Sequence, residues 1–292
     1  MPRSDRPSYD SLSHIFLDER VCFDLLVAER ILFKEKLCLC GRLLLYQEAR
    51  NGFRCTSGNC RKSSSVLGGT FFSQCNLPLN KIMHLAFMWL CKCTTSYAMA
   101  YTGHLSHTIC TYFIYFRQLV SDSLDELDCC IGGEGVEVEL DESKFGKRKY
   151  NRGHVVEGVW VLGGVERTSE RKVFLVAVPD RSQATLEDII SRHVYPGSII
   201  LTDFWRGYSR LTENFGYEHR TVNHSLNFVD PETNTHTNTI EGTWAGIKLG
   251  LPRRNRVLEG IDEHLFEFIW RRKHQINMWQ GFLSALRDVS FD

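Results

Sequence analysis

Three carboxylates stand in sequence surroundings that suit metal-dependent chemistry: Asp141 in VEVELDESKFG, Asp203 in GSIILTDFWRGY and Glu241 in HTNTIEGTWAGIK. The two aspartates each follow a short apolar segment typical of a strand, and Glu241 stands where an amphipathic helix should begin. Carboxylates gathered by a fold form the oxygen cage that holds two hard divalent cations, Mg²⁺ or Mn²⁺, for phosphoryl transfer. We therefore predict that these acids are the catalytic and metal-binding residues.

Each acid also has an ordinary structural explanation. An Asp after a strand often caps a turn or a helix. Glu142 could replace Asp141 as the ligand, because strand alternation turns only one of the two inward. Glu241 could close a capping box with Asn238, three residues earlier. The order of the elements around the three acids favours the catalytic interpretation.

The hydrophobic pattern of residues 136–275 predicts the elements that would position these acids. Strands are expected at VEVEL, VVEGVWVLGGV, KVFLVAV, SIILTD and YEHRTVNHS, and helices at ATLEDIISRHV, GYSRLTENFG, TNTIEGTWAGIKLGL and VLEGIDEHLFEFIWRRK. Three antiparallel strands followed by alternating helices and strands indicate an α/β fold of the RNase H-like kind, a mixed sheet flanked by helices. In such a sheet the strands that end at Asp141 and Asp203 are neighbours, and the helix with Glu241 packs across their edge.

A cysteine-bearing segment, residues 37–75, predicts a zinc ribbon. Cys38-x-Cys40 and Cys55-x₄-Cys60 are separated by the hairpin-like stretch LLLYQEARNGF, and four thiolates would close one tetrahedral structural Zn²⁺ site. The gaps of one and four residues are irregular for a ribbon, although Gly41 and Gly58 supply turn freedom. Buried free thiols are the alternative.

Helices dominate the rest of the first half. Residues 1–36 contain one predicted helix, IFLDERVCFDLLVAERILF, after a polar start expected to be disordered. Residues 76–120 predict three helices, and the turn at Gly103 between the last two suits a helix-turn-helix that binds DNA. Residues 121–135 are interpreted as a linker and 276–292 as a C-terminal tail.

Composition describes an ordinary globular protein: 43% of the 292 residues are hydrophobic, and 35 basic residues balance 35 acidic ones. The basic residues are clustered, however, and such patches hold backbone phosphates of DNA. No apolar signal-peptide core or membrane span is evident, which predicts an intracellular protein with reduced thiols. The predicted DNA-binding residues are Lys147, Arg148, Lys149, Arg152, Lys248, Arg253 and Arg254.

Several strings resemble a known family: VELDESKFGKRKYNRG, WVLGG, FLVAVPDRSQATLEDII, GSIILTDFWRGY, VNHSLNFVD and HTNTIEGTWAGIK are similar to the DDE transposases of the Merlin superfamily and their bacterial insertion-sequence relatives. The resemblance spans roughly residues 36–273. It implies that Asp141, Asp203 and Glu241 form the metal-binding triad of a strand-transfer enzyme. His224, His236 and Asn238 match as auxiliary residues, and loop hydrogen bonding is their alternative role.

The resemblance implies double-stranded DNA as partner, both the terminal inverted repeats of the element and the target, and no membrane. It also implies a homodimer or a larger synaptic complex, and nuclear localisation if the host is a eukaryote. Two other functions stay open at this point: a domesticated DNA-binding protein without catalysis, and a structure-specific nuclease that cuts but never joins.

Overall fold

A computed structural model describes residues 7–146, 158–203, 205–222, 236–252, 255–256 and 258–291. The chain divides into two compact units. Unit 1 comprises residues 1–123 and 275–292, and unit 2 comprises residues 124–274. None of the described helices is both long and apolar enough to span a bilayer.

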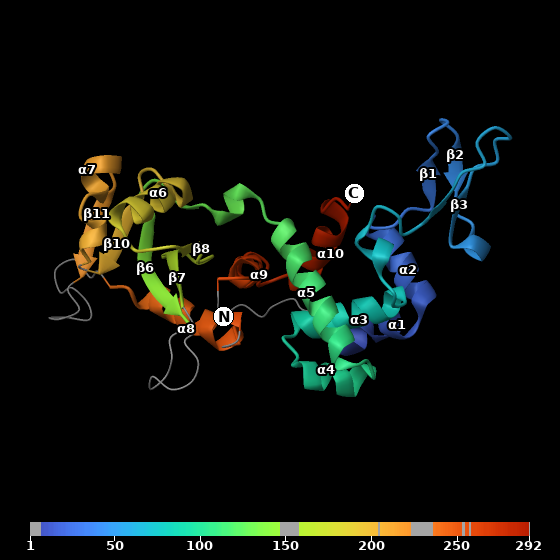
Figure 1. Ribbon diagram of the computed structural model, residues 1–292, viewed down its shortest axis with the longest axis horizontal. Helices are drawn as coiled ribbons and strands as arrows, with labels where there is room; N and C mark the ends of the chain where they lie inside the picture. Colours follow the sequence, from blue (N-terminus) through green and yellow to red (C-terminus); the bar gives the residue numbers. More distant parts are fainter. Residues whose placement is uncertain are drawn as a thin grey trace. The chain divides into compact units, whose positions relative to one another are not determined.

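Unit 2 is built on a five-stranded mixed sheet with the order β11-β10-β6-β7-β8 (Figure 1). β6, β7 and β8 are antiparallel to one another, whereas β10 runs parallel to both β6 and β11. The predicted mixed α/β sheet that starts with three antiparallel strands is therefore confirmed. The strands are β6 (Glu137–Phe145), β7 (Val159–Glu166), β8 (Val173–Val178), β10 (Ile199–Asp203) and β11 (Glu218–Val222).

Helices cover both faces of this sheet. On one face, Leu186 and Ile190 of α6 (Gln183–His193) are buried in a core with Val138 and Leu140 of β6. The other face packs against α8 (Asn238–Gly250) and α9 (Ile261–Lys273), whose buried residues share a second core with Phe145 of β6. Full burial of each such side chain stabilises the fold by about 1.5–3 kcal/mol. The smaller elements are η3 (Glu126–Cys129), β5 (Ile131–Gly132), β9 (Val194–Tyr195), η4 (Arg206–Tyr208) and α7 (Leu211–Phe215).

Unit 1 consists of helices and small hairpins. Where the sequence predicts one helix across residues 15–33, the structure has two, α1 (Tyr9–Leu17) and α2 (Glu19–Ala28). The single-helix prediction is wrong because Asp18, in an extended conformation, ends α1 and caps α2 by accepting from the amides of Arg20 and Val21. The predicted disordered start, residues 1–6, lies outside the described residues.

The three helices expected in residues 76–120 are present as α3 (Leu79–Leu90), α4 (Thr95–Thr102) and α5 (Ser106–Asp122). Gly103 ends α4 with a φ of 72°, a left-handed conformation that glycine adopts readily. Residues 276–292, predicted only as a tail, contain α10 (Met278–Asp288), and its Phe282 ring packs edge-on against Phe116 of α5.

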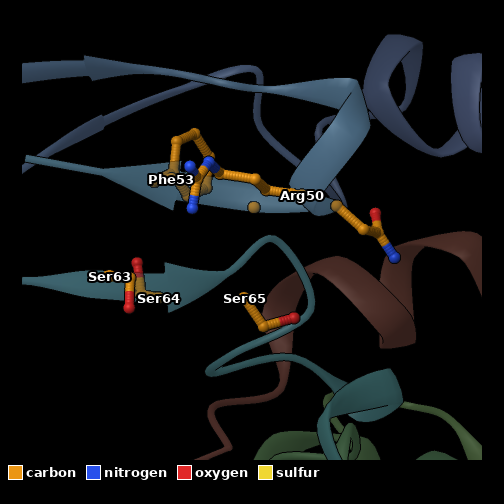
Figure 2. A pocket seen from close by; sticks show the side chains of 7 residues that line it. Arg50, Phe53, Ser63, Ser64 and Ser65 are labelled. Atoms are coloured by element: carbon orange, nitrogen blue, oxygen red, sulfur yellow. The ribbon is translucent and has the colours of Figure 1, made fainter.

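The cysteine segment of unit 1 forms two short antiparallel pairs, β1 (Glu35–Leu37) with β2 (Leu43–Leu45) and β3 (Gly52–Arg54) with β4 (Ser63–Ser65). A 3₁₀ turn, η1 (Glu48–Arg50), joins β2 to β3, and η2 (Phe71–Gln74) follows β4. Figure 2 shows the hollow between β3 and β4, with Arg50 and Phe53 on one side and Ser63 to Ser65 on the other. Its volume is about 640 Å³.

Candidate functional site

The register of the two central strands brings Asp141 and Asp203 side by side. β10 pairs in parallel with β6, with Leu201 opposite Glu139. Two residues further along both strands stand Asp203 and Asp141, and residues at the same register of parallel strands point to the same face. The prediction that these two strands are neighbours is confirmed.

Asp141 does not end its strand, as the sequence pattern suggests, and this detail is corrected. β10 stops at Asp203, but β6 continues to Phe145 because its other edge pairs with β7 over its whole length, with Asp141 opposite Gly163. The acid therefore lies on a rigid, paired segment. The last residues of β6 extend beyond the end of β10.

Alternation along β6 separates Asp141 from its neighbour Glu142. Glu142 lies on the same face as Leu140, where the Tyr208 hydroxyl donates to its carboxylate and the Arg181 guanidinium stands 3.7 Å away. Burial raises the pKa of Glu142, and the Tyr208 hydrogen bond acts in the opposite direction. Asp141 lies on the opposite face, the one covered by α8.

Three alternate residues of β6 bind α8 in succession. The buried carboxylate of Glu139 accepts from the amides of Thr239 and Ile240, at 2.8 and 2.9 Å. Asp141 Oδ2 accepts from the indole Nε1 of Trp244 at 2.9 Å, and the Lys248 ammonium donates to the Ser143 hydroxyl. Two residues of a strand span about 6.6 Å and four residues of a helix about 6 Å. The spacing of the contacting residues along α8 therefore matches their spacing along β6.

Glu241 lies on the side of α8 that faces β6. At about 100° per residue, Glu241 shares a face with Trp244 and Lys248, both of which contact the strand. Its side chain is exposed and its Oε1 lies 3.5 Å from the Thr237 hydroxyl. Asp141 and Asp203 therefore occupy matching positions of neighbouring strands, and Glu241 lies on the helix that covers their face of the sheet.

The capping-box alternative for Glu241 is wrong. The N-cap residue of α8 is Thr237, which makes no side-chain cap hydrogen bond, and the helix begins at Asn238 itself. The first amides of the helix are satisfied instead by Glu139, from a distant part of the sequence. Sequence reasoning missed Glu139, although a glutamate at an inward position of an apolar strand is a signal of a specific partner.

Asp141 has other acidic side chains close to it. The pKa of Asp141 is raised to about 7, first by burial and then by the nearby Glu142 and Asp203 carboxylates, while the Trp244 hydrogen bond opposes the shift. Repulsion between hard oxygen donors is what a divalent cation would relieve, so the donor set fits Mg²⁺ or Mn²⁺. Within the described residues, however, only the four cysteines discussed below have three or more donor atoms all within 4.8 Å of one another.

Comparison with known proteins shows the family of this chain. The sequence profile of the ISXO2-like transposase domain matches residues 129–255, a range that contains all three acids. An "uncharacterized transposase-like protein" of Haemophilus influenzae is 36% identical over 101 residues, which cover 34% of this chain and 80% of that protein. This chain belongs to the ISXO2-like transposase family. The matched range lies within unit 2, whereas Cys38, Cys40, Cys55 and Cys60 belong to unit 1.

The structure describes only some of the other residues predicted to function in this transposase. The Nδ1 atom of His236 lies 3.4 Å from Glu139, so His236 stands beside the helix cap, and Asn238 is the first residue of α8. Lys248 is half-buried, and burial and the neighbouring Arg256 lower the pKa of its ammonium. Seven predicted residues lie outside the described part of the chain: Lys147, Arg148, Lys149, Arg152, His224, Arg253 and Arg254.

The transposase also brings Cys38, Cys40, Cys55 and Cys60 together in unit 1. The Sγ atoms of Cys38 and Cys60 are 3.6 Å apart, as are those of Cys40 and Cys55. These distances exceed a disulfide bond of about 2.05 Å and approach the edge of about 3.8 Å of a tetrahedron with 2.3 Å Zn–S bonds. The four thiols could therefore hold a structural Zn²⁺.

Local turns explain how the irregular gaps between cysteines close. Gly41, with a φ of 81°, turns the chain directly after Cys40, and its amide bonds the Cys38 carbonyl. In the longer gap Gly58 lies in the turn that leads to Cys60, where the Cys60 amide bonds the Ser57 carbonyl, but it does not adopt positive φ; Arg61, directly after Cys60, does, with a φ of 48°. The predicted turn role of Gly41 is confirmed. A backbone hydrogen bond from Arg42 lowers the pKa of Cys40 to about 7, which favours the ligating thiolate.

Proposed function

We propose that this transposase cuts and joins DNA in an RNase H-like domain of residues 136–275, with Asp141, Asp203 and Glu241 as its DDE triad. The observation that supports the proposal is the common face: the β6–β10 register aligns the two aspartates, and Glu241 belongs to α8, the helix that packs on that face and bonds Asp141 through Trp244. Glu142 is the weaker candidate because it lies on the opposite face and is engaged by Tyr208 and Arg181.

The residues of the triad have distinct tasks in this proposal. Asp141 is oriented by Trp244, Asp203 stands at the end of its strand, and the exposed Glu241 reaches the solvent side where DNA would arrive. When bound, two Mg²⁺ or Mn²⁺ ions would activate the attacking oxygen and stabilise the leaving oxygen of a phosphodiester. Water is the first nucleophile, and the freed 3′-hydroxyl is the second.

Unit 1 supplies the DNA-binding part of the proposal. The four cysteines hold one structural Zn²⁺, and α4 and α5 act as a helix-turn-helix that reads the terminal inverted repeats. Phosphates of the duplex meet Lys248 and the basic residues predicted at 147–152 and 253–254. Synapsis of two element ends requires at least a homodimer.

The test uses the full chain and a plasmid that carries the genomic DNA flanking the gene. Wild-type protein with Mg²⁺ or Mn²⁺ should nick at the element ends and join pre-cut ends to target DNA. Asp141→Asn and Asp203→Asn should each abolish both reactions, whereas the neighbouring Glu142→Gln should keep measurable activity. Exposed Asp188→Asn on α6 serves as the charge-matched control.

Three outcomes separate the candidate functions. Nicking that persists unchanged in Asp203→Asn contradicts the proposal. DNA binding without cleavage in either metal favours a domesticated binding protein, and cleavage without joining of pre-cut ends favours a nuclease.

A further inference from the structure

A polar cavity of about 370 Å³ lies beside the first two turns of α8, and no function described above uses it. Two arginines from other elements line it, Arg171 before β8 and Arg272 near the end of α9. The remaining lining residues come from α8: Asn238, Thr239, Gly242 and Thr243. The cavity therefore combines two cations with small polar groups.

No carboxylate of the described residues neutralises the two arginines. Within the described part of the chain, neither guanidinium forms an ion pair or a hydrogen bond, whereas Arg167 and Arg220 nearby bind Glu137. The Arg272 guanidinium stands 5.4 Å from the centre of the Phe268 ring, which fixes its place without supplying a negative charge. Burial, and after it the charge of Arg171, lower the pKa of Arg272.

Two cations that line one cavity, with no counter-ion among the residues that the structure describes, favour an anionic ligand. Guanidinium groups bind phosphate oxygens in a bidentate manner, and the Thr239 side chain offers a hydroxyl donor, whereas the Thr243 hydroxyl already donates to the Thr239 carbonyl. The N-terminus of α8 does not account for such a ligand, because its amides at Thr239 and Ile240 already bind Glu139. The arginines carry the argument.

The cavity borders the proposed catalytic face. Asn238 and Gly242, which line the cavity, lie about 60° and 100° around the helix from Glu241, both on the side away from Trp244. A strand of DNA whose scissile phosphate lay at the triad would thus continue over α8 toward the arginines.

We propose that Arg171 and Arg272 clamp a backbone phosphate of the bound DNA beside the scissile position. The inference rests on the proposed function for its choice of ligand, since the same chemistry would also bind free phosphate. In this proposal the arginines position the DNA beside Glu241 through its phosphates and do not recognise bases.

Gly242 offers the sharpest test, because a Cβ atom placed there meets no atom within 4 Å. Gly242→Asp sets a carboxylate at the cavity, and Gly242→Ala adds the carbon alone. Binding of a fluorescent duplex oligonucleotide by the full chain is measured without divalent metal across a series of salt concentrations. Gly242→Asp and Arg272→Gln should each weaken binding about fivefold to tenfold at ~0.1 M salt and lower the salt slope by about 1.

Controls separate charge at the cavity from general effects. Gly242→Ala should bind as wild type, Arg272→Lys should recover part of the slope, and Arg192→Gln on α6 removes an equal charge elsewhere. Melting temperatures of all variants should stay near wild type. An unchanged salt slope in both Gly242→Asp and Arg272→Gln overturns the inference.

The failures of the two proposals are distinguishable. A salt slope lowered by about 1 in the cavity variants, together with no cleavage by wild type in any metal, supports the clamp and contradicts the DDE function. Cleavage by wild type, together with unaltered DNA binding in the cavity variants, supports the DDE function and contradicts the clamp. Stabilisation by millimolar inorganic phosphate that depends on Arg272, without any change in DNA binding, overturns DNA as the source of the phosphate.

Discussion

The indole Nε1 of Trp244 donates a 2.9 Å hydrogen bond to Oδ2 of Asp141, and this bond joins the helix of one proposed catalytic acid to the strand of another. The Trp244 ring is 4% exposed and packs directly over Gly163, the β7 residue opposite Asp141. A fixed donor of this kind orients one carboxylate oxygen and leaves the other lone pairs for a metal.

Trp244→Phe keeps most of the ring packing and removes the donor. We expect cleavage to fall about tenfold and to need more Mg²⁺, because groups that orient metal ligands have effects of this size. The measurement is nicking rate against Mg²⁺ concentration. Trp279→Phe, a buried tryptophan of unit 1, is the matched control and should leave the Mg²⁺ dependence unchanged.

Gly163→Ala should displace Trp244, because the new Cβ would lie 2.6 Å from Cη2 of the indole. Gly164→Ala is the control: its Cβ would meet Phe174 at 2.4 Å on the other face of the sheet. Both substitutions overpack the core and should cost about 1–3 kcal/mol of unfolding free energy. Only Gly163→Ala should also lower activity per folded molecule, and equal specific activities would contradict the role of Trp244.

Glu139→Gln should destabilise unit 2 strongly. The Glu139 carboxylate is fully buried, pairs with Arg167 at 2.7 Å and caps α8. Removing one partner of a buried ion pair costs about 3 kcal/mol, whereas Glu137→Gln, at a pair that is one-third exposed, should cost less than about 1 kcal/mol. Urea unfolding of both variants checks this, and similar midpoints would show that Glu139 does not anchor the helix.

Zinc binding is predicted to depend on the four clustered thiols. Purified wild-type protein should contain one Zn²⁺ per chain by elemental analysis, and Cys55→Ser should lose it together with the stability of the β1–β4 segment. Cys22→Ser changes a buried thiol of α2 outside the cluster and should retain the metal. Burial raises the pKa of Cys22 to about 12, which keeps that thiol protonated. Zinc-free wild-type protein with an intact fold would argue for free thiols.

Much of the fold is readable from local pattern. The alternation and apolar runs of unit 2 predict each strand of its sheet, and the turn at Gly103 is found as expected. The split between α1 and α2 is missed because the apolar period continues through Asp18, and only the backbone reveals the cap. The C-terminal helix α10 is missed for a similar reason, since its apolar face is satisfied by distant helices of unit 1.

The sequence by itself determined the candidate acids, the four cysteines and the resemblance to transposases, because residue type and spacing carry that chemistry. It could not decide between Asp141 and Glu142, nor between a ligand and a capping role for Glu241. Tertiary structure placed Asp141 and Glu142 on opposite faces of the sheet and began α8 at Asn238, since the face of a residue follows from strand register and helix packing across about 100 positions of sequence. The same packing supplied Glu139 as the cap and set Arg171 beside Arg272, relationships that no local pattern encodes.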